Sequence, residues 1–279
     1  MRHLILEYPK LAVRLSAPDD ISGILAQNFA HALTVAPSIV PRHAFEVRPG
    51  DDGLALVKNG AVIGLFADPS DLLFALEEDL EFALIESLDG WVGLHAGAVV
   101  LDDIAIVTVG HPDTGKTTTT LNLIELGLPF LCEEVTPVDP ETCAVHSFPH
   151  PLTLSRAYGE ALNVCYPVQH GVLTYHGPDM ARYSARRVHR TPVRLGAIVL
   201  PAYDPSATPA LTEVPPADVI PDLFQYCFAP TRGDELLYDS VIRVVEQCRL
   251  FRMQTCSIES ARTLLTQLVV ELSASPLQD

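Results

Sequence analysis

The chain has 279 residues, of which 48% are hydrophobic and 19% are charged, and its formal net charge is −17 at pH 7. This composition is typical of a globular protein with a substantial core and excludes an intrinsically disordered chain. The acidic balance repels a phosphate backbone, so we expect no nucleic-acid partner. A nucleotide remains compatible with it, because a loop of backbone N–H groups and one lysine acts locally.

The sequence shows no feature of export or of membrane insertion. Its N-terminal residues lack the apolar segment of a signal peptide, and no apolar run is long enough to cross a bilayer. The six cysteines are scattered and form no C-x-x-C pair. We therefore expect a cytoplasmic protein without a membrane partner, whose cysteines are buried, reduced thiols and not a zinc site. A homo-oligomer is left open.

Residues 1–90 are predicted to form a smaller, β-rich N-terminal region that serves as an accessory or substrate region. Its clearest element is a hairpin, since Asn59 and Gly60 supply the positive φ angles of a type I′ turn between two apolar runs. Asp19 and Asp20 are expected to cap a helix. The predicted strands lie at residues 3–6, 11–15, 54–58 and 61–66, and the predicted helices at residues 21–33 and 70–88, the second opened by Pro69.

Residues 91–279 have an α/β pattern. The predicted strands lie at residues 92–101, 104–109, 128–132, 195–200 and 250–255, and the predicted helices at residues 117–126, 218–228, 234–248 and 257–272. Residues 137–192 are rich in Pro, His and Tyr and have weak periodicity, which indicates strands and loops that move over a site. Residues 201–216 are predicted to be a proline-rich connector.

A phosphate-binding motif is the most informative feature of the sequence. Residues 110–117 read Gly-His-Pro-Asp-Thr-Gly-Lys-Thr, which matches the Walker A pattern G-x-x-x-x-G-K-[ST]. A strand pattern precedes the motif and a helix pattern follows it, so backbone N–H groups and a helix N-terminus converge on an anion. We expect Lys116 to reach the β and γ phosphates and Thr117 to ligate Mg²⁺. The predicted nucleotide-binding residues are Gly110, His111, Pro112, Asp113, Thr114, Gly115, Lys116, Thr117 and Thr118.

Two adjacent carboxylates, Glu133 and Glu134, follow the next predicted strand. Because the carboxyl ends of parallel strands meet where the ligand lies, we expect this pair near the γ-phosphate. Both can serve one site if the strand ends there and the chain turns. One carboxylate is then expected to hold Mg²⁺, and the other, beside a like charge in a dry site, to have a raised pKa and act as a base. A solvated acidic strand end is the alternative.

His95 is a further candidate, because Ala96, Gly97 and Ala98 beside it allow close approach by backbone or ligand. The alternative is a satisfied core histidine. A cluster of arginines is suited to a transferring phosphate or an acidic substrate, or is a solvated basic face. Its members are Arg182, Arg186, Arg187, Arg190 and Arg194. His146 and His150 are weak metal candidates, since the prolines beside them prevent the helix that would align the two rings.

With these elements in place, the chain resembles the HPr kinase/phosphorylase-like family, which includes short kinases that phosphorylate serine in peptide precursors. The matching segments are residues 94–98 (LHAGA), 110–117 (GHPDTGKT) and 130–135 (FLCEEV), with similarity to shorter relatives at residues 148–152 and 193–201. The resemblance implies an α/β fold with a P-loop kinase core of the HPr kinase/phosphoenolpyruvate carboxykinase type in residues 91–279. It also implies that His95 lies near the phosphates, that Glu133 is the base and that Glu134 is the metal-side carboxylate.

The sequence thus predicts an ATP- and Mg²⁺-dependent kinase that phosphorylates a serine or another hydroxyl on a peptide, a protein or a small molecule. Lys116, Glu133, Glu134 and His95 are its predicted catalytic residues. The N-terminal region does not resemble that of the bifunctional HPr enzymes, so we expect an acceptor other than HPr. The alternatives are an NTPase without kinase activity and a regulatory protein that binds a nucleotide.

Overall fold

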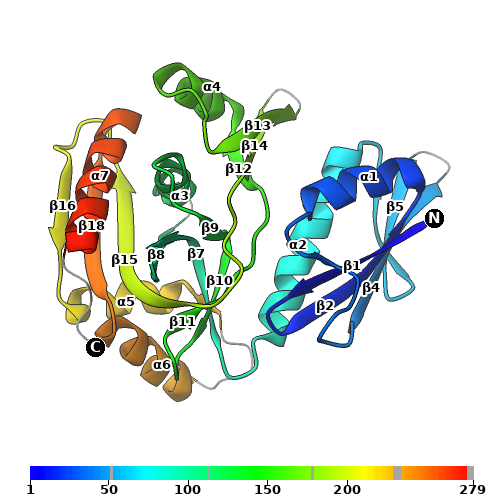
Figure 1. The fold of residues 1–279 in the computed structure, drawn as a ribbon, viewed down its shortest axis with the longest axis horizontal. Helices are drawn as coiled ribbons and strands as arrows, with labels where there is room; N and C mark the ends of the chain where they lie inside the picture. The colour runs from blue at the N-terminus through cyan, green and yellow to red at the C-terminus, as the bar shows by residue number, and fades with distance from the viewer. Residues whose placement is uncertain (51–52, 112, 177–178, 229–233, 275–279) are drawn as a thin grey trace. The chain divides into compact units, whose positions relative to one another are not determined.

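The computed structural model describes the whole chain except residues 51–52, 112, 177–178, 229–233 and 275–279. The chain divides into two compact units, Met1–Leu88 and Asp89–Asp279. Both units contain helices and strands, which confirms the predicted mixed α/β character (Figure 1). The functional roles predicted for residues 1–90 and 91–279 remain predictions.

The first unit is a six-stranded sheet with two helices. Its strand order is β3-β1-β2-β4-β5-β6. The strands are β1 Arg2–Tyr8, β2 Leu11–Ala17, β3 Leu33–Thr34, β4 His43–Gly50, β5 Gly53–Lys58 and β6 Ala61–Phe66, and the helices are α1 Asp19–Asn28 and α2 Pro69–Ser87.

The hairpin predicted in this unit is present, and the predicted helix cap is not. Asn59 and Gly60 join β5 to β6 with φ angles of 51° and 89°, both positive as a type I′ turn requires. Helix α1 has Pro18 at its N-cap, so Asp19 and Asp20 lie inside its first turn and make no side-chain cap. Acidic residues at that position favour the helix through its dipole instead.

The second unit contains a nine-stranded sheet with the order β11-β10-β7-β8-β15-β18-β16, in which β9 and β17 also pair with β7. Strands β8, β15 and β18 run parallel, and β7 is antiparallel to β8. The strands are β7 Val92–Leu101, β8 Ile104–Val109, β9 Phe130–Cys132, β10 Val135–Asp139, β11 Ala144–Val145, β15 Val193–Tyr203, β16 Ala210–Glu213, β17 Cys227–Phe228 and β18 Arg249–Thr255.

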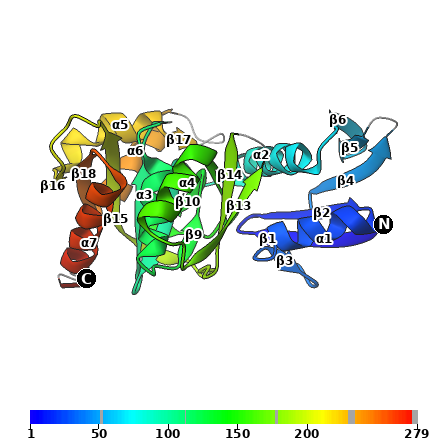
Figure 2. The same cartoon turned by 90° about the horizontal axis from the view of Figure 1, so that it is seen from above.

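Helices cover this sheet on two sides. Helices α3 Lys116–Glu125 and α7 Ile258–Ala274 pack against each other, whereas α6 Asp234–Glu246 packs against β7, β18 and α5 Ile220–Gln225. Figure 2 shows α5 and α6 together on the side of the sheet away from α3 and α7. A short 3₁₀ helix, Pro216–Asp218, precedes α5.

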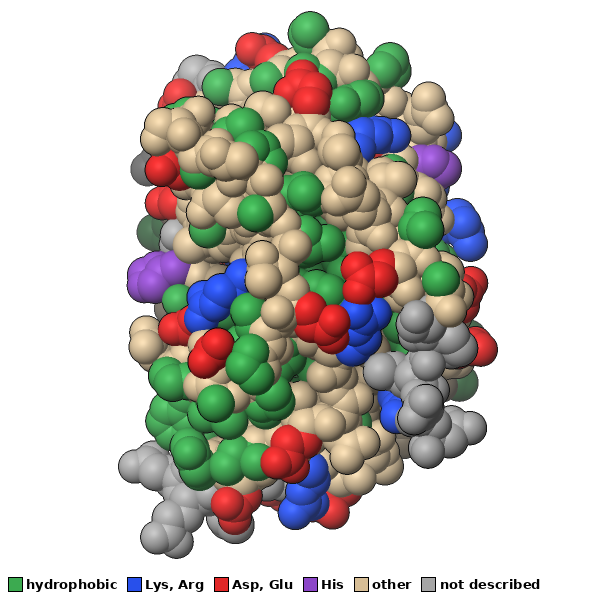
Figure 3. All heavy atoms as spheres, turned by 90° about the vertical axis from the view of Figure 1, so that its left-hand side faces the viewer, with side chains coloured by type: hydrophobic (Ala, Val, Ile, Leu, Met, Phe, Trp, Pro, Cys, Tyr) green, Lys and Arg blue, Asp and Glu red, His purple; other side chains and the backbone are tan. Residues whose placement is uncertain are grey.

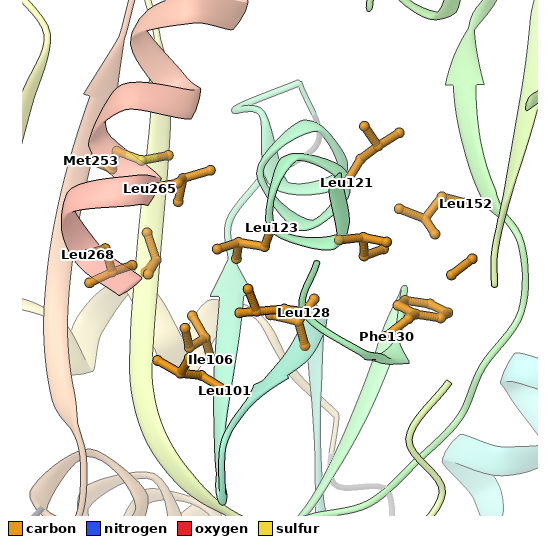
Figure 4. Close-up of a cluster of buried hydrophobic side chains, with 14 of the residues drawn as sticks. Leu101, Ile106, Leu121, Leu123, Leu128, Phe130, Leu152, Met253, Leu265 and Leu268 are labelled. Atoms are coloured by element: carbon orange, nitrogen blue, oxygen red, sulfur yellow. The ribbon is translucent and has the colours of Figure 1, made fainter. Parts of the chain in front are cut away.

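The core that holds α3 lies between α3, α7 and the sheet. Ile106 of β8 lies on the same side of α3 as Leu123 and as Leu265 and Leu268 of α7, whereas Leu121 belongs to this cluster on the opposite side of α3 (Figure 4). All five side chains are almost completely buried. Burying a leucine or isoleucine stabilises a fold by about 1.5–3 kcal/mol, so this cluster keeps α3 in place beneath the loop at its N-terminus.

Residues 137–192 contain more regular structure than the sequence indicated. Strands β12 Leu152–Ser155, β13 Gly171–His176 and β14 Met180–Ala185 form a three-stranded sheet in the order β12-β14-β13, and α4 Arg156–Cys165 is a helix that was not predicted. Helix α4 is amphipathic and buries Gly159 and Leu162, a local pattern that the weak periodicity of the region as a whole concealed.

The predicted connector at residues 201–216 includes strand β16, which pairs with β18. Arg249 on β18 forms ion pairs with Glu213 on β16 and Glu271 on α7, which joins the three elements. Figure 3 views the side of the molecule on which these three elements lie, and it shows acidic and basic side chains next to one another there.

The cysteines and the helices bear on two further expectations. All six cysteines have free thiols, but the expectation that all would be buried holds only for Cys132 and Cys143. Cys227, Cys248 and Cys256 are partly buried and Cys165 is exposed. Cys165 is near the end of α4, whose outer face is open to solvent. Among the described residues, no helix combines the length and the apolar character needed to span a bilayer.

Candidate functional site

The Walker A residues form the loop that joins β8 to α3. Gly115 has a φ angle of +100°, a left-handed conformation that favours glycine, and it is the N-cap of α3. Among the described residues, no side-chain hydrogen bond caps the first turn of this helix. Its first amides therefore lack a side-chain acceptor, which is the arrangement in which helix N-termini bind phosphate. Pro112, a predicted nucleotide-binding residue, lies outside the described residues.

The two residues that begin α3 each contact one of the adjacent glutamates. Nζ of Lys116 donates a hydrogen bond to Oε2 of Glu134 at 2.9 Å, and Oγ1 of Thr117 donates to Oε1 of Glu133 at 2.7 Å. Nε2 of His95 on β7 lies 2.7 Å from the same Oε2 of Glu134. All the predicted catalytic residues thus converge at the N-terminus of one helix.

A tight turn between two strands that pair with the same edge of β7 brings both carboxylates to this place. Strands β9 and β10 both pair with β7, and Glu133 and Glu134 lie between them. Glu134 has a φ angle of 61°, and the N–H of Val135 donates to the carbonyl of Glu133 at 2.7 Å. In a regular strand two adjacent side chains point to opposite faces, and this three-residue turn removes the alternation. Strand β9 thus ends at Cys132 and the chain turns, as the sequence led us to expect, and β10 then continues the pairing with β7 in the same register.

A histidine that the sequence offered only as a weak metal candidate lies behind this turn. The buried ring of His150 has Nε2 at 2.8 Å from the carbonyl oxygen of Glu133. His146, the other weak metal candidate, stacks on Trp91 with ring centroids 3.8 Å apart. Within the part of the chain that is described, no group of three or more His, Cys, Asp or Glu side chains could hold a metal ion.

The two glutamates have opposite electrostatic environments. Burial raises the pKa of Glu133, which is 1% exposed, and this outweighs the opposing effect of Lys116. Burial also acts to raise the pKa of Glu134, but the hydrogen bond from His95 and the charge of Lys116 outweigh it and lower this pKa to about 2. The side chain of Glu134 is 37% exposed. Glu134 is therefore the carboxylate that reaches solvent, and it is ionised at neutral pH.

These contacts differ from the roles that the family resemblance implied for the pair. The resemblance made Glu133 the base and Glu134 the carboxylate on the metal side. In the structure, Thr117, the expected metal ligand, contacts Glu133, which is closed off from solvent. Glu134 contacts the lysine and the histidine instead.

A cavity of about 800 Å³ opens in front of the loop, within the size range of small-molecule sites. His95, Glu134 and part of the predicted nucleotide-binding set line it. The members of that set are His111, Asp113, Gly115, Lys116, Thr117 and Thr118. The opposite walls come from the first turns of α4 and α7, including Tyr158 and Ile258. Sequence reasoning missed these residues, although Ser155 has the character of a helix N-cap and does cap α4.

A second cavity of about 400 Å³ lies on the other side of the loop. Gly110 and Thr114, predicted to bind nucleotide, line this second cavity, and His111 lines both. The ring of His111 packs edge-on against Tyr226 with centroids 6.0 Å apart. The remaining wall comes from the carboxyl ends of β15 and β18 and from α5 and β16.

The clustered arginines do not contribute to either cavity. Arg186 and Arg187 donate to the carbonyl oxygens of Gln169 and Gly127 at 3.2 and 3.1 Å, and Arg182 is buried. None of the five arginines is among the residues that line the two cavities. The structure therefore gives no support to the interpretation of this cluster as a phosphate site, and two of its members tie loops together.

Comparison with known proteins gives limited information. No protein-family model matches the sequence, and no curated protein matches it. Among solved structures, the HPr(Ser) kinase/phosphatase from Coxiella burnetii is similar to this chain at 11% sequence identity and a TM-score of 0.33. The match covers 65% of this chain and 98% of that one, and it describes a distant likeness.

Proposed function

We propose that the protein is an ATP- and Mg²⁺-dependent kinase that transfers the γ-phosphoryl group to a hydroxyl of a peptide or a small molecule. The observation that supports this best is the convergence of Lys116, Thr117, Glu133, Glu134 and His95 at the N-terminus of α3. Phosphoryl transfer mainly requires positioning and neutralisation of charge. A cradle of amides, a lysine, oxygen ligands for the metal and a base are the groups it needs, and each has a residue here.

The oxygen atoms of Thr117 and Glu133 suit Mg²⁺. This ion prefers oxygen ligands and is usually held by one or two carboxylates together with substrate phosphates. Oε2 of Glu133 is buried and has no hydrogen-bond partner in the described part of the chain, so the carboxylate has capacity beyond its bond to Thr117. We therefore assign these two residues to the metal side. A bound Mg²⁺ would neutralise charge on the β and γ phosphates.

Glu134 is the carboxylate we assign as the base, with His95 orienting it. Lys116 and His95 both contact its Oε2, which keeps its pKa low. A triphosphate offers Lys116 other oxygens, and once Lys116 contacts them the carboxylate loses one of these two donors and becomes more basic. The acceptor hydroxyl then gives its proton to Glu134 while its oxygen bonds to the γ-phosphorus and the bond to ADP breaks.

Calorimetric titration of the full chain with ATP, in the presence and absence of Mg²⁺, tests the first part of this proposal. We expect binding that Mg²⁺ strengthens, and no uptake of ATP or GTP would overturn the proposal. Mass spectrometry of candidate peptides and small alcohols after incubation with Mg²⁺ and ATP tests the second part. ADP release that never depends on an acceptor would indicate an NTPase instead.

A further inference from the structure

Gly97 lies on β7 opposite the turn that holds the two glutamates. On one edge of β7, Gly97 pairs with Thr108 of β8. On the other edge, Ala98 pairs with β9 and His95 pairs with β10. The N–H of Ala96 donates to the carbonyl of Glu134 at 3.3 Å. Because β7 is held on both edges at this level, it cannot move aside to admit a side chain at position 97.

The carboxylate of Glu133 occupies the space where a side chain at position 97 would lie. A Cβ atom added to Gly97 would overlap Oε2 of Glu133 and Oγ1 of Thr120. The carboxylate is buried in this space, so it cannot stay there beside an added methyl group. Only glycine, whose side chain is a hydrogen atom, leaves this space free for the carboxylate of Glu133.

Thr120 is held too firmly to give way in its place. Its Oγ1 lies 2.6 Å from Oγ1 of Thr108 and donates to the carbonyl of Lys116 at 3.1 Å. Oγ1 of Thr108 in turn donates to the carbonyl of Gly97 at 3.1 Å. Since both threonines are buried, an added methyl group would displace the carboxylate of Glu133 and not these hydroxyl groups.

We propose that Gly97 is a positioning residue for the metal side of the site. Because Gly97 has no side chain, the carboxylate of Glu133 can lie beneath Thr117. There Oε1 of Glu133 accepts a hydrogen bond from the hydroxyl of Thr117 at 2.7 Å. Displacing the carboxylate breaks this contact and separates the two oxygen ligands that the proposed function gives to Mg²⁺, on which this inference rests. Lys116 and Glu134 keep their own contact.

The test is a calorimetric measurement of ATP affinity over a series of Mg²⁺ concentrations. Mg²⁺ is expected to increase the affinity for ATP, and the midpoint of this increase is the Mg²⁺ concentration to compare. In Gly97→Ala we expect this midpoint to rise about 10- to 100-fold, which is the usual effect of substituting a residue that supports a metal ligand. ATP affinity without Mg²⁺ should stay as in the unmodified protein. Unchanged Mg²⁺ dependence in a folded Gly97→Ala protein would overturn the inference.

A second variant provides a rescue. Glu133→Asp shortens the side chain by one methylene and withdraws the carboxylate from the space at position 97. The double variant Gly97→Ala/Glu133→Asp should then show the Mg²⁺ dependence of Glu133→Asp alone. If Gly97→Ala does not fold, a folded double variant with this dependence supports the inference, and a double variant that is also unfolded overturns it.

Gly196→Ala is the matched control. Gly196 lies on β15, and an added Cβ there would overlap Ile104. In the sheet order, β8 and β7 lie between β15 and β10, the strand that follows the two glutamates. This variant should lower the thermal unfolding temperature and leave the Mg²⁺ dependence unchanged. If the unmodified protein binds no ATP, the proposed function fails. If it binds ATP with Mg²⁺ dependence and Gly97→Ala matches it, only this inference fails.

Discussion

Nε2 of His95 lies 2.7 Å from Oε2 of Glu134, and Lys116 donates to the same oxygen at 2.9 Å. One carboxylate oxygen is therefore shared between an imidazole and the ammonium group of the phosphate-binding motif. Charge-assisted contacts of this kind keep a carboxylate ionised and oriented. A nucleotide that attracts Lys116 leaves His95 as the group that holds Glu134 in place.

Lys116→Ala should reduce the turnover of the proposed kinase at least ~10²-fold, the scale for losing one preorganised charge donor. The measurement is ADP release or phosphate transfer at saturating ATP. Lys58→Ala is the control, because Lys58 pairs with Asp79 in the other unit and should leave turnover unchanged. Turnover that is the same in Lys116→Ala and the unmodified protein would show that the loop does not bind the transferred phosphate.

Glu134→Gln and Glu133→Gln should separate the base from the metal side. Glu134→Gln removes the group that accepts the proton, so we expect at least ~10²-fold slower transfer, in the range for general-base catalysis, with Mg²⁺-dependent ATP binding retained. Glu133→Gln should instead weaken the contribution of Mg²⁺ to ATP affinity. Calorimetry and a transfer assay on both variants check this, and the reverse pattern would restore the roles that the family resemblance implied.

The two substitutions should also change thermal stability in opposite directions. The folded state raises the pKa of Glu133 above 4.5, so the unfolded chain ionises first as the pH rises and folding is disfavoured above that pH. Glu133→Gln should therefore raise the unfolding temperature at pH 7, and the gain should vanish as the pH falls below 4.5.

The folded state lowers the pKa of Glu134 from 4.5 to about 2, so its ionised form stabilises the fold above 4.5. Glu134→Gln should lower the unfolding temperature at pH 7. The difference should shrink as the pH falls from 4.5 towards about 2. Circular dichroism over a series of pH values measures both effects, and two shifts of the same sign would contradict these assignments.

Tyr183→Phe should weaken the attachment of the three-stranded sheet to α3. The hydroxyl of Tyr183 on β14 donates to Oε1 of Glu125 at the end of α3 at 2.5 Å, and both residues are buried. Losing a buried hydrogen bond to a charged group costs about 1.5–3 kcal/mol in the free energy of unfolding, which urea unfolding can measure. Tyr175→Phe on β13, an exposed position, is the control and should change this value by less than about 0.5 kcal/mol.

Local sequence signals accounted for several elements of both units. The strand before the loop and the helix after it follow from apolar periodicity and from the glycine at position 115, and the structure has both. The hairpin at Asn59 and Gly60 was predictable for the same reason, since turn geometry depends on the residues of the turn itself. Helix α4 was missed, although its N-cap Ser155 and its amphipathic pattern are local signals of the same kind.

The sequence by itself determined which chemical groups this protein has for binding a phosphate. The motif and the acidic pair are each a continuous segment of the chain, so both can be recognised without the fold. The sequence did not determine what each glutamate contacts. That depends on the turn at Glu134 and on the pairing of its flanking strands with β7. Strand β7, which is remote from the pair in sequence, contributes the imidazole of His95 and the space left by Gly97. Pairing between distant segments, and the burial it produces, decided which carboxylate is closed off and which one faces the cavity.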